Sequence, residues 1–277
     1  MSGQLYLLPC PISEAPALDA LPASTVETAR RIDHFLVEAA RTARATLKAM
    51  GHPKPIAELD IVEIGHDPAP ELISEWLQPV LDGADAAVLS ESGCPGVADP
   101  GAQIAARAHE LGICVVPLTG PSSILLTLMA SGLDGQRFRF SGYLPKHDAE
   151  RRAAILAAEK ASRASETQLF IETPYRNTAL LDALLETLAP DTRLTVAIDV
   201  TGQNESIRTL TAAAWKAIPK AMRTLPKLPT VFAFLAKPGN RAPRYAPECA
   251  GGKRAHTAPS SKPAVLNNRP KQAFKTH

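Results

Sequence analysis

The segment at residues 90–101, Ser-Glu-Ser-Gly-Cys-Pro-Gly-Val-Ala-Asp-Pro-Gly, has the composition of a loop that binds a ligand through its backbone. It follows the apolar run 86–89, precedes a helical pattern, and contains three glycines and two prolines. With so few bulky side chains, its backbone can approach a ligand closely. Ligands of open α/β sheets bind at the carboxyl ends of strands, where this loop would lie. An ordinary tight turn between a strand and a helix can have the same composition, so the loop alone leaves both interpretations open.

Several other chemistries are not indicated. The loop lacks both the Gly-Lys-Ser/Thr ending of a nucleoside triphosphate loop and the Gly-x-Gly-x-x-Gly fingerprint of dinucleotide binding. Cys94 has no His or other activating neighbour in sequence, which disfavours nucleophilic catalysis by its thiol. The four cysteines form no Cys-x-x-Cys pair, and no His lies at zinc-ligand spacing from them. We therefore expect reduced thiols, no metal site and a cytoplasmic protein. The cysteines are Cys10, Cys94, Cys114 and Cys249.

Short apolar strands that alternate with helical patterns must position this loop. Within residues 1–118 the sequence predicts strands at 4–8, 35–39, 60–64, 85–90 and 113–117 and helices at 26–33, 42–50, 70–81 and 101–111. This alternation is typical of βαβ units that build a parallel sheet. Gly112 is predicted to cap the last of these helices.

The sequence Pro-Leu-Thr-Gly-Pro at residues 117–121 interrupts the pattern, because prolines on both sides of a glycine continue neither a strand nor a helix. We place a domain boundary after residue 118. The second half, 119–237, is predicted to contain helices at 122–131, 148–162, 175–188 and 211–221 and strands at 137–142, 167–172, 193–200 and 229–236. The predicted fold class is therefore α/β, with an N-terminal domain at 1–118 and a C-terminal domain at 119–237.

Composition indicates a soluble protein with an unevenly charged chain. Hydrophobic residues make up 45% and charged residues 21%, and apolar runs such as 124–130 are too short to span a membrane. The start of the chain lacks the pattern of a signal peptide, so we do not expect export. From residue 237 onward there are nine Lys/Arg and one acid, whereas the first 236 residues hold 21 bases and 27 acids. Residues 238–277 contain six prolines and few large apolar residues, so we expect a disordered basic tail.

Five segments, in order, resemble the tetrapyrrole-methylase superfamily, and most closely its branch of small-subunit ribosomal RNA 2′-O-methyltransferases. Residues 93–101 match that branch's Gly-x-Pro-x-x-x-Asp-Pro-Gly loop. The other matching segments are 38–44, similar to Glu-x-x-Arg-x-x-Arg; 120–123 with 130–133, similar to the interdomain loop and helix; 140–146 with 150–152, similar to Phe-x-Gly-Phe-Leu-Pro-Arg/Lys and the bases beyond it; and 170–176, similar to Tyr-Glu-Ser-Pro-His-Arg. A chance match of five ordered blocks is improbable.

This resemblance implies an S-adenosylmethionine-dependent methyltransferase that is a homodimer, with the cofactor in a cleft between its two α/β domains. In the family, the loop corresponding to 93–101 lines the cofactor pocket. The residues that the resemblance assigns to the cofactor are Gly93, Cys94, Pro95, Asp99, Gly101, Gly120, Ser122 and Ser123.

A sulfonium is already an activated leaving group, so positioning should supply most of the acceleration. A ribose hydroxyl is a poor nucleophile, and Glu172 and Glu205 are our candidates for a base beside it, with Arg176 completing the predicted catalytic set. The acceptor would carry phosphates, which Lys146, Arg151, Arg152 and Arg176 could hold. Tyr143 and Tyr175 could stack on an extruded nucleoside.

Each block also has a structural interpretation that stays open. Glu38, Arg41 and Arg44 could form a solvated charged face of a helix. Asp148 could be the N-cap of a surface helix, and Glu150, Arg151 and Arg152 could simply be residues at the start of that helix. Ser122 and Ser123 could be helix caps, and Glu172 and Arg176 could be exposed charges at a strand end.

Because of departures from the family pattern, the sequence defines the identity of the methyl acceptor less well than that of the cofactor. Residues 13–16, Ser-Glu-Ala-Pro, replace a Gly-Asn-Leu-Gly-like loop, and Gly202 stands where a Lys is expected. The Gly-Pro-Gly-Asp-Pro loop of true tetrapyrrole methylases is also missing. The leading hypothesis is 2′-O-methylation of ribosomal RNA. Two alternatives are methylation of a tetrapyrrole or other small molecule, and an RNA- or protein-binding paralogue without turnover.

The tail generates the first testable prediction. A chain that ends at Lys237 should keep its melting temperature and its cofactor affinity, because a disordered segment contributes no core. If the tail contacts a polyanion, truncation should also weaken RNA binding and make its salt dependence shallower, since the eight Lys/Arg side chains beyond Lys237 are removed. Thermal unfolding and RNA titrations measure both effects. A markedly lower melting temperature would show that the tail packs on the rest of the protein.

Overall fold

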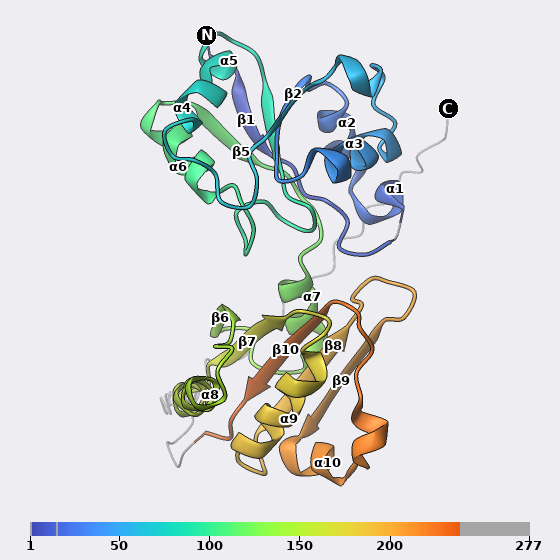
Figure 1. Cartoon of the computed structure of the whole chain (residues 1–277), viewed down its shortest axis with the longest axis vertical. Coiled ribbons are helices and arrows are strands. Elements are labelled where there is room, and N and C mark those ends of the chain that lie inside the picture. The colour runs from blue at the N-terminus through green and yellow to red at the C-terminus, as the bar shows by residue number, and fades with distance from the viewer. Residues whose placement is uncertain (1, 15, 239–277) are drawn as a thin grey trace, which may run out of the picture. The chain divides into compact units, whose positions relative to one another are not determined.

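The computed structural model describes residues 2–14 and 16–238, which form two five-stranded sheets (Figure 1). Both sheets belong to one compact unit, Met1–Gly239. The α/β fold class is as predicted from the alternation of strands and helices. The predicted disordered tail lies outside the described residues except for Pro238. None of the helices in the described part is both long and apolar enough to cross a membrane.

The first sheet is parallel throughout and has the strand order β3-β2-β4-β1-β5. The five predicted strands are confirmed to within two residues. They are β1 (Gln4–Leu7), β2 (His34–Val37), β3 (Asp60–Glu63), β4 (Ala86–Leu89) and β5 (Cys114–Pro117). Pro117 fits at the end of β5 because β5 is an edge strand, where a missing N–H leaves no neighbour without a hydrogen bond.

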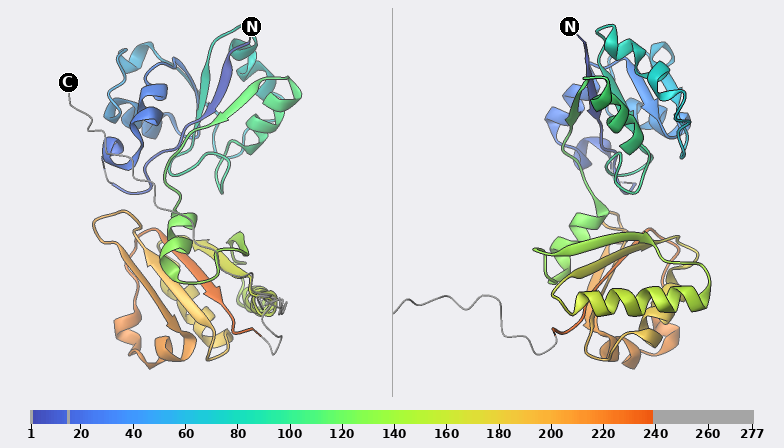
Figure 2. Two further views of the ribbon diagram at one scale, coloured as in Figure 1. Left: turned by 180° about the vertical axis from the view of Figure 1, so that it is seen from behind. Right: turned by 90° about the vertical axis from the view of Figure 1, so that its left-hand side faces the viewer.

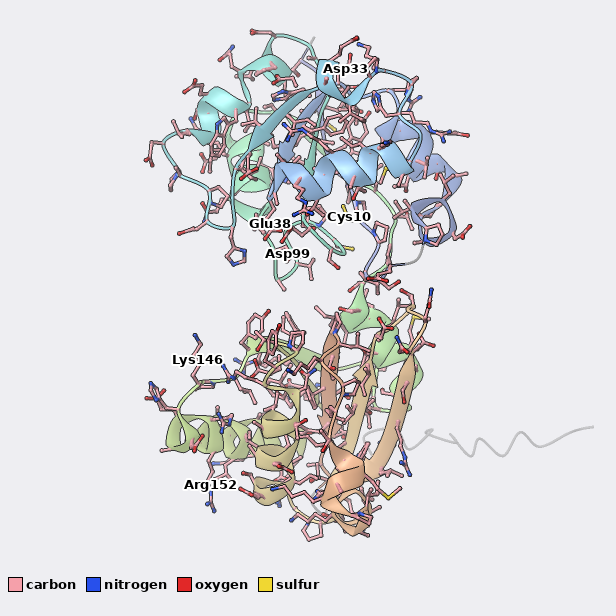
Figure 3. The ribbon with its side chains drawn as sticks, turned by 45° about the vertical axis from the view of Figure 1, so that its right-hand side comes forward. Cys10, Asp33, Glu38, Asp99, Lys146 and Arg152 are labelled. Atoms are coloured by element: carbon pink, nitrogen blue, oxygen red, sulfur yellow. The ribbon has the colours of Figure 1, made fainter. Side chains whose placement is uncertain are left out.

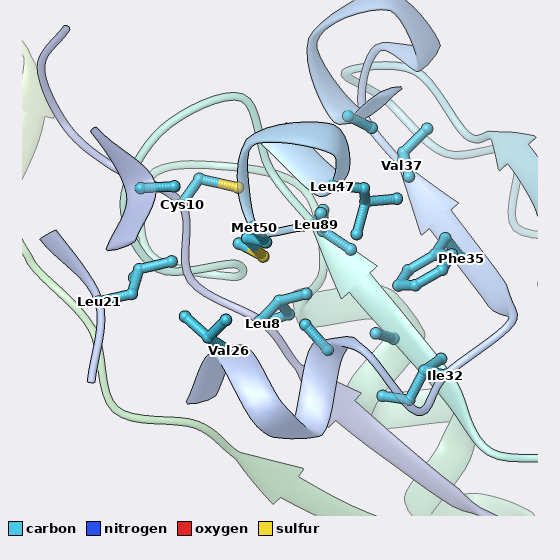
Figure 4. Packing of buried hydrophobic residues seen from close by; sticks show 14 of the residues in the cluster. Leu8, Cys10, Leu21, Val26, Ile32, Phe35, Val37, Leu47, Met50 and Leu89 are labelled. Carbon is cyan, nitrogen blue, oxygen red and sulfur yellow. The ribbon is translucent and has the colours of Figure 1, made fainter. Parts of the chain in front are cut away.

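Alternate residues along these strands face two separate cores. Phe35, Val37 and Leu89 pack with helices α2 (Ala23–Ala29) and α3 (Ala40–Ala49) on one face of the sheet (Figure 4). Leu36 and Val88 pack on the other face with helices α4 (Ile73–Trp76), α5 (Gln78–Leu81) and α6 (Ala102–Glu110). Burial on both faces explains why these strands read as continuous apolar runs in sequence.

The helices of this half differ from the predicted ranges in two places. The predicted helix 70–81 is divided into α4 and α5, because Pro79 provides no N–H to continue the helix but is tolerated in the first turn of a new one. The predicted helix 26–33 both begins and ends earlier, since α2 runs from Ala23, after Pro22, to Ala29, and a further short helix, α1 (Ala17–Ala20), precedes it. Gly112 follows α6 with φ +72°, as predicted for a cap.

The second sheet is mixed and has the order β6-β7-β10-β8-β9. Its strands are β6 (Phe138–Tyr143), β7 (Thr167–Glu172), β8 (Arg193–Ile198), β9 (Ser206–Thr211) and β10 (Thr230–Leu235). Strand β9 was not predicted: its Ser-Ile-Arg-Thr-Leu-Thr sequence is mostly polar, and it is a partly exposed edge strand. Strand β10 is antiparallel to both β7 and β8, so Thr230 at its start lies opposite Glu172 and Ile198 at their ends.

Helices cover both faces of this sheet (Figure 2). Helices α8 (Asp148–Ser162), α9 (Asn177–Thr187) and α10 (Ala212–Ala217) pack on one face against the stacked rings of Phe170 and Phe234. Helix α7 (Ser123–Ser131) packs on the other. The predicted helix 211–221 is wrong at its end, since α10 stops before Pro219 and a short 3-10 helix, Lys220–Arg223, follows.

Candidate functional site

The loop at 90–101 is held in a conformation that depends on its glycines. Gly93 has φ +72°, a region that other residues rarely adopt. Gly101 has φ +131°, and a Cβ there would lie only 3.0 Å from the backbone nitrogen of Gly96. Ala98 adopts φ +68° without that freedom. Backbone strain of this kind occurs most often at functional sites, so the loop has features of a binding loop and not only of a turn.

Backbone hydrogen bonds join this loop to the segment after β1. The nitrogen of Cys10 donates to the oxygen of Gly93 at 2.8 Å, and the nitrogen of Gly93 donates back to Cys10 at 3.2 Å. The thiol of Cys94 donates to the oxygen of Pro121 at 3.4 Å. A Cβ on Gly120 would lie 2.2 Å from Pro9, so this glycine permits close packing of the same segments. Three stretches far apart in sequence therefore meet at one point.

These segments line a cavity of about 330 Å³ within the unit Met1–Gly239. This volume falls in the range of ~300–1,000 Å³ found for small-molecule sites. Most of its lining is apolar or backbone, with a few hydroxyl groups and two carboxyl groups. The residues that line it are Ile12, Ser92, Gly93, Cys94, Val97, Ala98, Asp99, Ser122, Ser123, Ile124, Tyr143, Ile171, Glu172, Thr173, Pro174, Val200, Pro229, Thr230 and Val231.

Glu172 is the most deeply buried acid of this cavity, with its side chain only 1% exposed. Its Oε1 accepts a hydrogen bond from the backbone nitrogen of Thr173 at 2.7 Å. Its Oε2 lies 2.9 Å from Nη2 of Arg176, an ion-pair contact without hydrogen-bond geometry. Within the described residues, this buried oxygen therefore has no hydrogen-bond donor. A buried carboxylate oxygen without a donor is costly unless a ligand supplies one.

Asp99 belongs to a cluster of acids at the ends of β2 and β4 (Figure 3). The pKa of Asp99 is raised to about 6, mainly by burial and secondly by the negative charge of Glu38. Glu38 itself accepts from the backbone nitrogen of Glu91 at 3.0 Å and lies 3.0 Å from Nδ1 of His66. The hydrogen bond to Glu38 raises the pKa of His66. This half of the site therefore holds more negative charge than the protein compensates.

The two cysteines near the cavity are not activated. Burial raises the pKa of Cys10 to about 12 and also raises the pKa of Cys94. A thiol with a raised pKa carries little thiolate near neutral pH. The structure thus agrees with the sequence argument that disfavoured Cys94 as a nucleophile.

Most of the predicted cofactor residues lie at the cavity. Gly93, Cys94, Asp99, Ser122 and Ser123 line it, and Ser122 also caps α7, because its hydroxyl accepts from the nitrogen of Leu125. Pro95, Gly101 and Gly120 are not lining residues. Gly101 and Gly120 instead allow close backbone packing behind the lining. Their assignment to the cofactor stays a prediction.

The two candidate bases have different surroundings. Glu172 lines the cavity, whereas Glu205 is exposed and its Oε2 accepts from the backbone nitrogen of Thr201 at 2.7 Å. Gly202, in the same β8–β9 loop, has its Cβ direction filled by the carboxylate of Asp199, at 2.1 Å from Oδ1. The Lys expected there would require Asp199 to move. Through its hydrogen bond with the Thr201 nitrogen, Glu205 stabilises the turn of its own loop.

The predicted phosphate contacts lie outside the lining. Lys146 and Arg152 are exposed and project from opposite sides of the chain near the start of α8 (Figure 3). Arg151 is only 13% exposed, and it donates to the oxygen of Lys146 and to Asp148. Residue His147, and not Asp148, stands at the N-cap position of α8. Arg151 is thus held in the turn that begins α8, a geometry that leaves it less available to a phosphate.

The two tyrosines differ in their position relative to the cavity. Tyr143 is a lining residue and is 59% exposed. Tyr175 is 80% exposed, lies outside the lining, and has Nζ of Lys227 5.1 Å from its ring centre. Tyr143 is therefore the better placed of the two to stack on a ligand in the cavity.

Sequence reasoning missed the contribution of β10. Pro229, Thr230 and Val231 line the cavity because β10 runs antiparallel to β7 and β8 and begins where they end. Asn177 fixes this start: its Nδ2 donates to the oxygen of Leu228 at 2.8 Å and to the hydroxyl of Thr230 at 2.9 Å. A strand direction cannot be read from an apolar run, so no signal in the sequence indicated these residues.

Comparison with known proteins agrees with this arrangement. Residues 17–215 match the sequence model of the family described as Tetrapyrrole (Corrin/Porphyrin) Methylases. The match covers more than half of the chain, so the chain belongs to this family, a class of S-adenosylmethionine-dependent methyltransferases.

Curated relatives of the chain carry a more specific name. It is 30% identical to the Ribosomal RNA small subunit methyltransferase I of Bacillus subtilis over 73% of this chain and 65% of that protein. It is likewise 30% identical to the protein of that name in Vibrio cholerae, over 74% of this chain and 67% of the relative. The chain thus spans only about two thirds of the length of these relatives.

Solved structures show the same fold at low sequence identity. A diphthine synthase superposes with a TM-score of 0.59 at 17% identity, covering 84% of this chain and 90% of the other. The methyltransferase CobJ gives a TM-score of 0.57 at 16% identity, covering 85% and 95%. These structures share the architecture, and their acceptors do not carry over at such identities.

Replacement of Gly93 tests the binding role of the loop. Gly93→Val should abolish binding of S-adenosylmethionine and S-adenosylhomocysteine, because a branched side chain would enter the cavity beside Ile12, whose Cγ2 lies 3.4 Å from the Cβ position. Gly112→Val is a matched control: Gly112 also has φ +72°, but no atom lies within 4 Å of its Cβ position. Both changes should cost about 1–2 kcal/mol of stability through backbone strain. Calorimetry on both folded proteins measures binding, and unchanged affinity in Gly93→Val would remove the loop from the cofactor site.

The raised pKa of Asp99 predicts a pH-dependent stability. A neutral Asp99 is favoured in the folded state, so its favourable contribution is complete below about pH 3.8 and is lost as pH rises through about 6. Asp99→Asn should therefore melt at a higher temperature than the unmodified protein at pH 7.5, by a margin that shrinks toward pH 4.5. Asp67→Asn, an exposed acid in the same half, is the control and should show no such trend. An Asp99→Asn margin that stays constant with pH would contradict the buried-charge explanation.

Proposed function

We propose that this protein transfers the methyl group of S-adenosylmethionine to a ribose 2′-hydroxyl of small-subunit ribosomal RNA. The observation that carries the proposal is that the loop 93–101 and the buried carboxylate of Glu172 line one cavity. The class of acceptor is supported by relatives named Ribosomal RNA small subunit methyltransferase I and by the motif blocks at 140–146 and 170–176. From the same resemblance we propose a cytoplasmic homodimer.

The cavity has features that fit this cofactor. Left-handed Gly93 leaves bare backbone at the lining, and the hydroxyls of Ser122 and Ser123 lie at the same surface. Asp99, which forms no ion pair among the described residues, provides negative charge on the side of this loop. When bound, S-adenosylmethionine supplies a methyl group on a positively charged sulfonium. Gly93, Cys94, Asp99, Ser122 and Ser123 would hold it.

Glu172 is suited to act on the acceptor hydroxyl. Methylation of a hydroxyl releases its proton, and a carboxylate with an unfilled acceptor position can receive that proton. The ion pair with Arg176 compensates the charge of Glu172, while the Thr173 nitrogen fixes the position of its other oxygen. Hydrogen bonding to Glu172 would also orient the hydroxyl before transfer.

The remaining contacts to RNA would come from one lining residue and from exposed cations outside the cavity. Tyr143 at the lining can stack on a nucleobase, and the exposed Lys146 and Arg152 can meet phosphates. Arg151 acts mainly on the protein itself, through Lys146 and Asp148.

A second cavity favours one alternative acceptor. It has a volume of about 390 Å³, shares Ile12, Ser92 and Pro229 with the first, and is lined by Glu14, Glu91 and Asp199 with no Lys or Arg. An acceptor buried there would be neutral or cationic, because carboxylates repel phosphates and the carboxylates of tetrapyrroles. The alternative function is therefore methylation of a small neutral or basic molecule, with the RNA phosphates of the leading proposal kept outside this cavity.

Conservative replacement of the two candidate bases tests the mechanism. Glu172→Gln should lower kcat for methyl transfer about 10²–10⁴-fold, the usual contribution of a general base, while the affinity for S-adenosylmethionine stays within about threefold. Glu205→Gln is the matched change outside both cavities and should leave the transfer step nearly intact. Labelled S-adenosylmethionine is supplied with small ribosomal subunits, and separately with uroporphyrinogen, whose carboxylates should make it a poor acceptor. Absence of transfer to small ribosomal subunits by the unmodified protein would reject the RNA proposal, whatever the result with uroporphyrinogen, and equal rates for the two variants would reject Glu172 as the base.

A further inference from the structure

Helix α3 carries three cations on one solvent-facing side. Its sequence, Ala-Arg-Thr-Ala-Arg-Ala-Thr-Leu-Lys-Ala, contains no acid. Arg41, Arg44 and Lys48 lie at i, i+3 and i+7, so they share one side of the helix, and all three are exposed. The opposite side packs Ala43 and Leu47 into the core. The helix therefore presents a continuous basic face, which we define as Arg41, Arg44 and Lys48.

No acid of the described residues forms an ion pair with this face, although Glu38 and Glu91 lie near the start of the helix. Helix α3 contacts α1, β3 and the 3-10 helix Ile56–Glu58, whose acids are Asp19, Asp60, Glu63 and Glu58. None of these forms an ion pair with the basic face, among the ion pairs of the part of the chain that the structure describes. Glu63 instead accepts from the backbone nitrogen of Ala40 at 2.8 Å.

The spacing of these cations along the helix is destabilising. Surface helices gain stability when opposite charges lie three or four residues apart, whereas Arg41–Arg44 and Arg44–Lys48 are like-charged pairs at those spacings. Arg41 also lies in the first turn, where the helix dipole disfavours a positive charge. An anion bound along this face would remove both conflicts.

The start of the helix is fixed to the cofactor loop. The hydroxyl of Thr42 donates to Oε1 of Glu91 at 2.8 Å. The nitrogen of Glu91 donates to Glu38, which stands just before the helix. Arg41 therefore lies beside the 90–101 loop, and the basic face leads away from it.

We propose that the basic face of α3 is a phosphate-binding surface that holds the RNA strand whose ribose enters the cavity. This proposal rests on the proposed function. From Arg41 to Lys48 there are seven residue steps, or about 10 Å of helix. A stacked strand carries one phosphate per ~3.4 Å of its axis, so a strand aligned with the helix can bring about three phosphates to this face.

The residues between the cations favour RNA over other anionic partners. Ala45 and Ala49 are the exposed apolar residues of α3, and neither is large enough to insert into a membrane or fill a pocket of a protein partner. A surface of charges separated by small side chains is suited to a flexible polyanion, which contacts charges without deep packing.

A triple variant and a charge-matched control test this surface. Arg41→Ala, Arg44→Ala and Lys48→Ala together keep good helix formers. The control, Lys160→Ala, Arg163→Ala and Lys216→Ala, removes the same charge from exposed positions on α8, at its C-cap and on α10. The probe is a labelled fragment of small-subunit ribosomal RNA, titrated at several salt concentrations. The α3 variant should reduce the slope of log K against log salt by about 2, at about 0.7 for each lost single-strand contact, whereas the control should not.

Calorimetry with S-adenosylmethionine completes the test, and all three proteins should bind it equally. Equal RNA binding by both variants would overturn the assignment of α3, even if the unmodified protein methylates RNA. Loss of cofactor affinity in the α3 variant would also overturn it, because the basic face would then belong to the cofactor site. If the unmodified protein neither binds nor methylates RNA, the proposed function fails first and the RNA surface falls with it.

Discussion

The pair of backbone hydrogen bonds between Cys10 and Gly93 is the constraint on which the site depends. It joins the segment after β1 to the loop after β4, two neighbouring strands of the parallel sheet. To make both bonds and continue into its loop, residue 93 adopts φ +72°, which explains why glycine stands there. A third segment, around Gly120, packs against Pro9. This contact also requires glycine, because a Cβ at position 120 would overlap the proline. The side-chain-poor character of the lining thus follows from the packing of backbone against backbone.

The two carboxyl groups of the cavity illustrate how burial acts differently with and without a partner. Glu172 is almost wholly buried, and Arg176 lies 2.9 Å away to compensate its charge. Asp99 is partly buried and forms no ion pair among the described residues, so burial, and after it the charge of Glu38, raises its pKa to about 6 against the opposing effect of His66. A protein retains an uncompensated acid of this kind at a cost in stability, and a cationic ligand removes that cost when it binds. The imbalance on the Asp99 side is therefore consistent with a positively charged cofactor, and the balance at Glu172 with a group that acts on a neutral hydroxyl.

Much of this arrangement could be predicted from the sequence, because the strands of the first sheet are buried on both faces and read as apolar runs. The loop at 90–101 could be predicted from its composition and its place after such a run. The features that were not predicted from the sequence also have physical causes. Strand β9 is polar and exposed at an edge, the direction of β10 is set by its neighbours in the sheet, and Pro79 divides a helical pattern that looked continuous. Arg151 reads as a free cation in sequence, but Lys146 and Asp148 hold it in the fold.

Charge is distributed in a way that separates two tasks. The cavities contain Asp99, Glu172, Glu14, Glu91 and Asp199 and no Lys or Arg among their lining residues. Unpaired cations such as Arg41, Arg44 and Arg152 lie on exposed surfaces instead. A polyanion would therefore be attracted to the outside of the protein and repelled from its interior. For an RNA acceptor, this pattern admits only the sugar and the base, whose hydroxyl and amino groups can donate to carboxylates, and keeps the phosphate backbone at the surface. Extrusion of a single nucleoside from its strand is the binding mode that such a distribution of charge favours.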